Sequence, residues 1–231
     1  GGLRMSNSDT FHTGWVPQCG VSVNPGRGFN IKASLSKGYR NPSFRELYLY
    51  AMANPDLEPE SMMNYEVSLS RRFGIGATAS LTAYYCKGDN MIQTLDMKNQ
   101  NTGRFINKGI EASLGWQPVT SLSLSATYSY LHTSLHDLTG APRHQYYIGA
   151  DWRVSPTVNI GADLKGVSRL FVHESMDHQS YAVVNLKASW SACRHADLFV
   201  RIENLTDASY VINRGYDMPG LSALGGFKLH F

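Results

Sequence analysis

Long apolar runs are missing from this sequence. No stretch approaches the ~18 consecutive apolar residues that a membrane helix requires, and the mean hydropathy is −0.27. Helical membrane spans are therefore excluded. Membrane strands are not, because a strand that faces lipid on one side only is half polar.

Charge and cysteine are also scarce. Charged residues make up 17% of the chain, below the roughly 25% of a typical soluble domain. The net charge of +3 includes no run of lysine or arginine, which argues against a nucleic-acid partner. Cys19, Cys86 and Cys193 are widely spaced and fit neither a disulfide framework nor a zinc site.

The sequence also lacks signals for secretion and for catalysis. The first four residues carry no apolar signal core, so we expect any export signal to lie upstream. There is no GxSxG motif and no convincing set of nucleophile, base and orienting group. We therefore expect no enzyme activity and no bound cofactor.

The chain is instead rich in residues typical of strands and turns. Aromatic residues reach 11%, with 13 tyrosines, and there are 21 glycines. In residues 121–131, Leu122, Leu124 and Ala126 alternate with polar residues, a period of two that places apolar side chains on one face of a sheet. This pattern predicts eleven strands, at about residues 13–23, 29–39, 62–73, 77–87, 105–116, 121–131, 145–153, 158–165, 184–190, 197–203 and 227–231.

The connections between these strands have a regular rhythm. Short turns of about four to six residues alternate with long connections of about twelve to twenty-two, as in outer-membrane barrels. The sequence therefore predicts an all-β fold, an antiparallel up-and-down transmembrane β-barrel; a large soluble β-sandwich is the alternative. Charges of both signs on the polar face indicate a wet or protein-filled lumen. Because bacterial single-chain barrels have even strand counts, eleven strands indicate a piece of a barrel.

Several stretches also resemble one family. They are Ser36 to Tyr48, Asn54 to Glu60, Asn107 to Pro118, Ile202 to Tyr210, Gly215 to Gly220 and the terminal Phe231. In this order they look like the C-terminal barrel of TonB-dependent outer-membrane transporters. That barrel has 22 strands and a plugged lumen. The resemblance implies that residues 1–231 form the C-terminal portion of such a barrel, without its plug domain and N-terminal strands.

The resemblance also implies a location and structural roles. The protein would lie in the outer membrane of a Gram-negative cell, with its long loops outside. Phe231 resembles the signal that the barrel-assembly machinery reads. Asn204 and Asp207 would close the penultimate strand at the outer rim, and the Pro219-Gly220 turn would start the final strand.

The function implied by the resemblance is active import of a scarce ligand with energy from the TonB complex. A ferric siderophore or other metal chelate is the expected cargo; cobalamin, haem and oligosaccharide are alternatives, as is a passive porin-like or structural barrel. Haem is disfavoured because residues 43–53 contain no histidine. The candidate ligand-binding residues are Tyr48, His136, His144, His173, Met176 and His178, in the long loops. Imidazole and thioether groups can coordinate iron or copper; the alternative is that these loop residues are only solvated.

Overall fold

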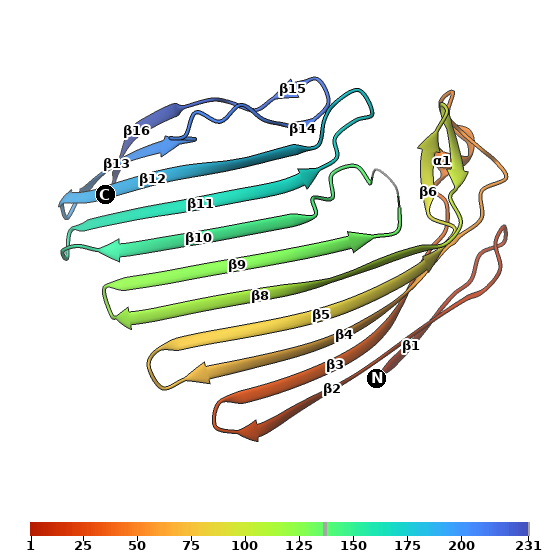
Figure 1. The fold of residues 1–231 in the computed structure, drawn as a ribbon, viewed down its shortest axis with the longest axis horizontal. Coiled ribbons are helices and arrows are strands. Elements are labelled where there is room, and N and C mark those ends of the chain that lie inside the picture. Colours follow the sequence, from red (N-terminus) through yellow and green to blue (C-terminus); the bar gives the residue numbers. More distant parts are fainter. Residues whose placement is uncertain (136–137, 231) are drawn as a thin grey trace.

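The computed structural model describes residues 1–135 and 138–230, and twelve antiparallel strands form one open sheet (Figure 1). Its order is β1-β2-β3-β4-β5-β8-β9-β10-β11-β12-β13-β16, so each strand pairs with its neighbours along the chain. The strands are β1 (Gly2–Ser6), β2 (Gly14–Gly26), β3 (Phe29–Arg40), β4 (Glu60–Phe73), β5 (Ala77–Asp89), β8 (Phe105–Val119), β9 (Leu122–Thr133), β10 (His144–Arg153), β11 (Val158–Leu170), β12 (Gln179–Cys193), β13 (Ala196–Glu203) and β16 (Ser222–Leu229).

The predicted fold class is confirmed, and the main sheet has one strand more than the sequence indicated; two short hairpins in the connections were also not predicted. The additional strand is β1, which pairs with β2 from Gly2↔Gln18 to Ser6↔Gly14. It was missed because five residues are too short to show a clear alternation. The final strand begins at Ser222 rather than near residue 227. The prediction began too late because Gly225 and Gly226 interrupt the apolar alternation. With twelve strands, β1 and β16 run in opposite directions, so the odd strand count was wrong, although the conclusion drawn from it, a piece of a barrel, is confirmed. The sheet is an open part of a barrel, with β1 and β16 as its edges.

Short and long connections lie at opposite ends of the strands, as predicted (Figure 1). The short turns are residues 27–28, 74–76, 120–121, 154–157 and 194–195. Residues 41–59 include α1 (Phe44–Tyr48), and residues 90–104 include the hairpin β6 (Ile92–Leu95) and β7 (Lys98–Asn101). Residues 204–221, here called the last connection, include the hairpin β14 (Val211–Asn213) and β15 (Tyr216–Asp217).

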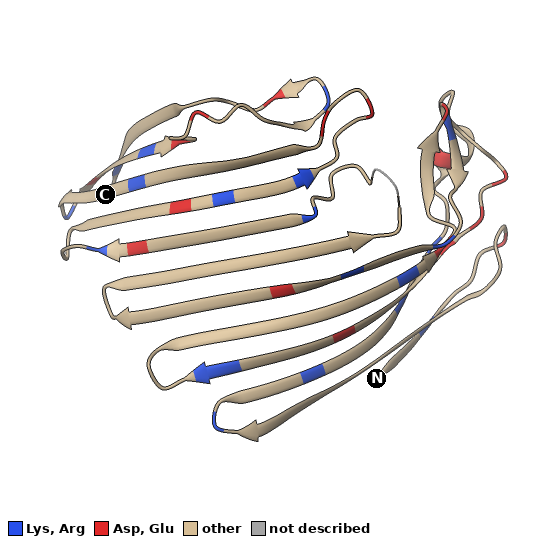
Figure 2. Cartoon of the chain, in the orientation of Figure 1, with Lys and Arg blue, Asp and Glu red and all other residues tan. Residues whose placement is uncertain are grey.

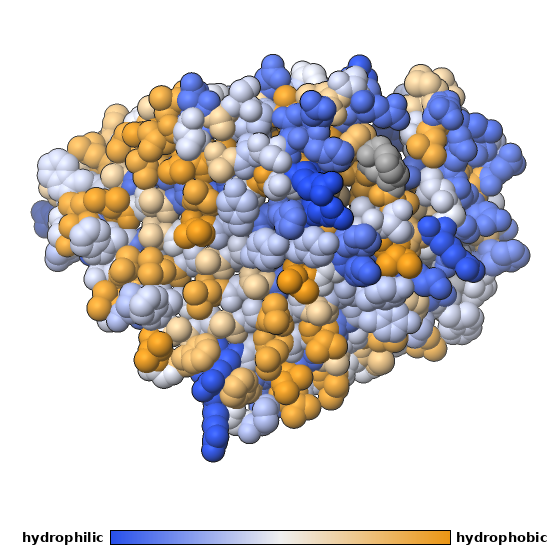
Figure 3. Space-filling model, in the orientation of Figure 1, coloured by the Kyte–Doolittle hydropathy of each residue, from blue (hydrophilic) through white to orange (hydrophobic). Residues whose placement is uncertain are grey.

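One face of the sheet, here called the outer face, is apolar and uncovered. Leu81 is 51% exposed, Ile148 58% and Trp190 50%, and hydrophobic surface is widespread in Figure 3. Only seven described hydrophobic residues are buried, so no second layer forms a core over this face. A broad exposed apolar surface on long strands is typical of strands that face lipid.

The opposite face, here called the inner face, carries the polar partners of the alternation. Lys187 Nζ lies 2.6 Å from Asp151 Oδ1, and Asn185 donates to Asp163 Oδ2 at 2.8 Å. Charged residues are sparse along the strands, and β9 has none (Figure 2). Within the described residues, no helix is long and apolar enough to cross a membrane.

Candidate functional site: a cavity under the last connection

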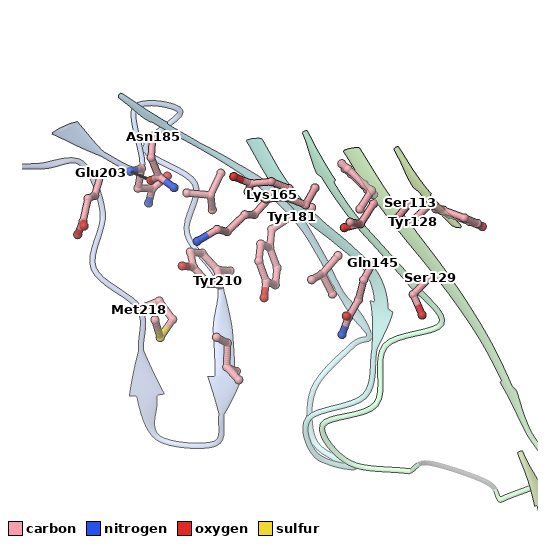
Figure 4. Close-up of a pocket in the computed structure, with 18 of the residues that line it drawn as sticks. Ser113, Tyr128, Ser129, Gln145, Lys165, Tyr181, Asn185, Glu203, Tyr210 and Met218 are labelled. Carbon is pink, nitrogen blue, oxygen red and sulfur yellow. Dashed lines mark hydrogen bonds between the residues drawn. The ribbon is translucent and has the colours of Figure 1, made fainter. Parts of the chain in front are cut away.

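A cavity of about 920 Å³ lies between the inner face and the last connection. Figure 4 shows side chains from several strands on one side and those of the last connection on the other. Many of the residues that line it carry a polar or ring-bearing side chain. They include Ser113, Ser129, Gln145, Tyr147, Lys165, Tyr181, Asn185, Glu203 and Tyr210, with Glu111 of β8.

Asn204 anchors the start of the last connection. It is only 3% exposed and has a φ of 52°, in the left-handed region that asparagine tolerates better than most residues. Its Nδ2 donates to the carbonyl oxygens of Ala208 at 2.9 Å and Pro219 at 3.0 Å. Its Oδ1 accepts from the amide of Ala208 at 2.9 Å and from Thr206 Oγ1 at 3.1 Å. One side chain thus joins the two ends of the connection.

Asp207 makes the second tie across the base of the last connection. Its Oδ1 accepts a hydrogen bond from the amide of Leu221 at 2.8 Å. A Cβ at position 220 would lie 2.6 Å from the same oxygen, so the close approach requires Gly220. Asn204, Asp207, Pro219 and Gly220 therefore meet in space at the base of the last connection.

Beyond this base, two side-chain contacts hold the β14–β15 hairpin against the rest of the molecule. The Tyr210 ring stacks on Tyr181 of β12, with ring centroids 4.0 Å apart and an interplanar angle of 23°. At the hairpin turn, Arg214 Nη1 lies 2.8 Å from His173 Nε2. The hairpin is therefore secured at its base and rests on a ring stack farther out.

Two other long connections, residues 41–59 and 90–104, form a separate structure at the same end of the strands. Ser43 caps α1: its Oγ accepts from the Glu46 amide at 3.3 Å, while the Ser43 amide donates to Glu46 Oε2 at 2.7 Å. Arg40 donates twice to Glu46, at 2.9 and 3.1 Å, and its Nε lies 2.5 Å from Glu60 Oε2. The Arg40 guanidinium, helped by hydrogen bonds from Ser43, lowers the pKa of Glu46 to about 2.

Residues 41–59 and 90–104, here called the paired connections, are joined to each other. Asn54 Nδ2 donates to the Asn99 carbonyl at 2.8 Å. Asn101 Oδ1 accepts from the Glu58 amide at 2.8 Å, and its Nδ2 donates to the Glu58 carbonyl at 3.0 Å. Leu57 is 3% exposed between these contacts. Asparagine side chains thus replace the backbone pairing that irregular loops lack.

The predicted ligand-binding residues do not form one cluster. Tyr48 is 53% exposed, with its ring 5.3 Å from that of Phe44. His144 is the first residue of β10 and is bonded at 2.8 Å to Tyr128, on the outer face rather than in a loop. Within residues 1–135 and 138–230, no three histidine, cysteine or acidic side chains come together to hold a metal.

Three of the predicted residues share the 171–178 connection. The Met176 amide donates to the His173 carbonyl at 3.0 Å, and His173 Nδ1 accepts from the Ser175 amide at 3.1 Å. The His178 ring lies 5.8 Å from Phe171. Among these three residues, His173 is bonded to the last connection through Arg214. His136 and Phe231 lie outside the described residues.

Sequence reasoning missed the side chains that line the cavity. Tyr181 and Lys165 lie on polar positions of predicted strands or next to them, which pointed to the inner face but not to a particular partner. Tyr210 lies in an irregular segment without a periodic signal. Their meeting depends on the last connection folding inward, which no local pattern predicts.

Comparison with known proteins identifies the family that has this architecture. The profile described as TonB dependent receptor-like, beta-barrel matches residues 1–205. The chain belongs to the TonB-dependent receptor β-barrel family. Among its relatives, the vitamin B12 transporter BtuB of Photobacterium profundum is 26% identical over 94% of the chain and 38% of the relative. An iron-regulated outer membrane virulence protein of Vibrio cholerae is 26% identical over 71% of the chain and 30% of the relative.

Solved receptors share the same fold. The siderophore receptor PirA from Acinetobacter baumannii superposes with a TM-score of 0.80 at 17% sequence identity, over 99% of this chain and 43% of that one. The chain thus spans about two fifths of the length of PirA and of the transporter BtuB. It is a partial receptor barrel, which accounts for the two unpaired sheet edges.

Proposed function

We propose that this chain is the C-terminal half of the barrel of an outer-membrane receptor that imports a scarce ligand with energy supplied by TonB. The observation that carries the proposal is the family match over residues 1–205, together with a polar inner face behind an uncovered apolar outer face. Related receptors named for vitamin B12 and for siderophores support a transport role. A ferric siderophore or another metal chelate is the proposed cargo.

The proposed receptor has several partners. Outer-membrane lipid would contact the outer face, where Leu81, Ile148 and Trp190 are exposed. The plug and the TonB-contacting segment would belong to the rest of the receptor, and the barrel-assembly machinery would recognise Phe231. The long connections would face outside and meet the ligand, with Tyr48, His173, Met176 and His178 as contact candidates. We propose no nucleic-acid partner and no enzyme activity.

The proposal can be tested with the full-length receptor. Expressed in a Gram-negative strain that lacks its own chelate receptors, it should restore uptake of a metal chelate. That uptake should stop when TonB is deleted or the proton gradient is collapsed. Uptake that persists without TonB would contradict active transport.

A passive porin-like barrel is the competing function. Liposomes that contain the purified full-length receptor should not swell in sugar solutions, because the plug closes the lumen. Rapid swelling without any coupling protein would favour the passive pore instead.

A further inference from the structure

Toward the long connections, the outer face carries three lysines on neighbouring strands. Lys37 of β3 is paired with Met63 of β4, and Met63 is paired with Lys87 of β5. Lys108 of β8 lies directly opposite Tyr85 of β5, which is 39% exposed on the outer face. Residues in register on paired strands share a face, as do residues two apart on one strand. All three lysines therefore lie on the outer face, and they are here called the outer basic cluster.

The sheet sets the spacing within the outer basic cluster. Only β4 separates Lys37 from Lys87, which places their backbones about 10 Å apart at the usual strand spacing of ~4.8 Å. Lys87 is paired with Ile106, so Lys108, two residues farther along β8, is its diagonal neighbour at about 7–8 Å. A lysine ammonium is a compact charge on a flexible stem. Three of them spread over this width match an anion that carries more than one phosphate group.

A groove of about 470 Å³ lies beside the cluster, between β4 and β5. Tyr65 and Tyr85 line it, with ring centroids 6.2 Å apart and an interplanar angle of 53°. Met63 adds thioether surface, and Lys87 lines the part nearer the long connections. One groove thus offers ring and thioether surface next to a cation, which matches a molecule with an apolar chain and an anionic end.

The acidic residue that lines this groove does not cancel the positive charge. Asp89 Oδ1 lies 3.0 Å from Arg104 Nε, which comes from the residue just before β8. The guanidinium offsets the Asp89 carboxylate, so the lysines set the sign of the local charge. The groove and its surroundings therefore attract an anion.

The positive charge is confined to one flank of the outer face. The paired outer-face residues of β10 and β11 include no lysine or arginine; they are His144, Tyr146, Ile148, Ala150 and Trp152 with Ser168, Gly166, Leu164, Ala162 and Ile160. Tyrosines occur on this flank as well, as expected at a membrane interface. An interfacial position alone therefore does not account for the three lysines, whose concentration on β3, β5 and β8 points to one bound molecule.

The depth of the cluster along the strands indicates which anion it meets. Tyrosines of a membrane barrel gather at the level of the lipid headgroups. Lys87 comes two residues after Tyr85, about 7 Å nearer the long connections. The cluster thus lies at the headgroup level of the leaflet next to the long connections, where lipid phosphates lie.

We propose that the outer basic cluster and the adjoining groove bind a phosphorylated lipid of the outer leaflet. Its phosphate groups contact Lys37, Lys87 and Lys108, and an acyl chain lies along Tyr65 and Tyr85. A free phosphate ion has no chain to fill the groove. The inference rests on the outer-membrane location in the proposed function and goes beyond it, because lipid binding requires neither a cargo nor energy coupling.

The test measures retention of radiolabelled, bisphosphorylated lipid A by full-length receptor immobilised in detergent. The unaltered receptor should retain this lipid, and added salt should weaken the binding because partly exposed charges hold it. Lys87→Gln combined with Lys108→Gln should weaken the binding about thirtyfold, from a fivefold contribution of each lysine near an anionic lipid.

The inner face supplies a charge-matched control. Lys32 and Arg72 are paired with Ser68 and Thr78 on that face. Lys32→Gln combined with Arg72→Gln removes the same charge from the receptor and should retain lipid A like the unaltered receptor. Each variant is first shown to be folded by its heat-modifiable mobility on gels.

Three results would overturn the proposal. Equal retention of lipid A by the folded Lys87→Gln, Lys108→Gln receptor would exclude the site. Equal retention of dephosphorylated lipid A would exclude phosphate recognition, and release of lipid A by millimolar inorganic phosphate would assign the cluster to a free anion. The transport function fails separately: TonB-dependent uptake by a receptor that does not retain lipid A leaves that function standing, whereas lipid A retention without such uptake contradicts transport alone.

Discussion

The paired connections and the last connection are both long, yet they are held in different ways. Residues 41–59 and 90–104 bond to each other through Asn54, Asn99 and Asn101, and they enclose Leu57. The last connection bonds to itself at its base through Asn204 and Asp207, and that base also bonds to β12. The paired connections are thus held by bonds to each other, whereas the hairpin of the last connection is held beyond its base by the Tyr181–Tyr210 stack and the Arg214–His173 contact.

Because of this difference, we expect the two regions to differ in the free energy of local opening. Local opening free energy is low where few contacts hold a segment and high where many do. The paired connections should therefore open together and rarely. The hairpin of the last connection should open often, while its base stays closed. Four measurements on the full-length receptor can break or sharpen this contrast.

Asn204→Ala should have the largest effect. It removes four side-chain hydrogen bonds at a position that is 3% exposed and leaves partly buried carbonyl and amide groups unpaired. We expect a loss of about 2–4 kcal/mol in stability, seen as a lower temperature for heat-modifiable gel mobility. Asn213→Ala, at an exposed position of β14, should leave this temperature unchanged. An equal effect of both substitutions would show that Asn204 is not the anchor.

Asn101→Ala should loosen both paired connections at once. Asn101 bonds to the amide and carbonyl of Glu58 and to the carbonyl of Asn90. Its loss should cost about 1–3 kcal/mol locally and speed hydrogen exchange in both 41–59 and 90–104. Gln100→Ala, which loses only a bond to Leu95 within the same hairpin, is the control. Faster exchange confined to 90–104 would mean that the two connections are independent.

Tyr210→Ala should release the hairpin and nothing else. Loss of the stack on Tyr181 should cost about 0.5–1.5 kcal/mol. Hydrogen exchange should rise in residues 208–219 and stay unchanged in 41–59. Tyr216→Ala, at a 74% exposed position of the same hairpin, is the control. A simultaneous rise at both places would contradict separate behaviour of the two regions.

Acid should weaken the paired connections with a small effect centred on α1. The pKa of Glu46 lies below its ordinary value of 4.5, at about 2. A lowered pKa means that the Arg40–Glu46 pair contributes stability above pH 4.5, and that this contribution is lost as pH falls toward 2. Because the pair is partly exposed, we expect at most about 1 kcal/mol. Hydrogen exchange in residues 44–49, corrected for the intrinsic pH dependence of exchange, should accelerate as pH falls below 4.5, and Glu46→Gln should remove this pH dependence.

Much of the fold could be predicted from periodicity. Alternation such as Leu122, Leu124 and Ala126 located most strands, because a half-exposed sheet imposes a period of two on its sequence. The loop-length rhythm gave the up-and-down order. The short β1 was missed and the start of β16 was placed too late, because five residues or two adjacent glycines carry too little pattern.

The candidate site was predicted less well. Asn204, Asp207, Pro219 and Gly220 were assigned a structural role from a resemblance, and the structure brings them together at the base of the last connection. The histidines were grouped by chemistry, but His144 lies on the outer face and His173 contacts Arg214. Residue type alone does not show toward which face or loop a side chain is directed.

The sequence by itself determined the strands, their order and the two faces, because these follow from local alternation and from connection length. Only the tertiary structure decided that the paired connections bond to each other and that the last connection folds inward to place Tyr210 on Tyr181. Such contacts join irregular segments far apart in the chain. Their geometry depends on the curvature and register of the whole sheet, which no local segment encodes.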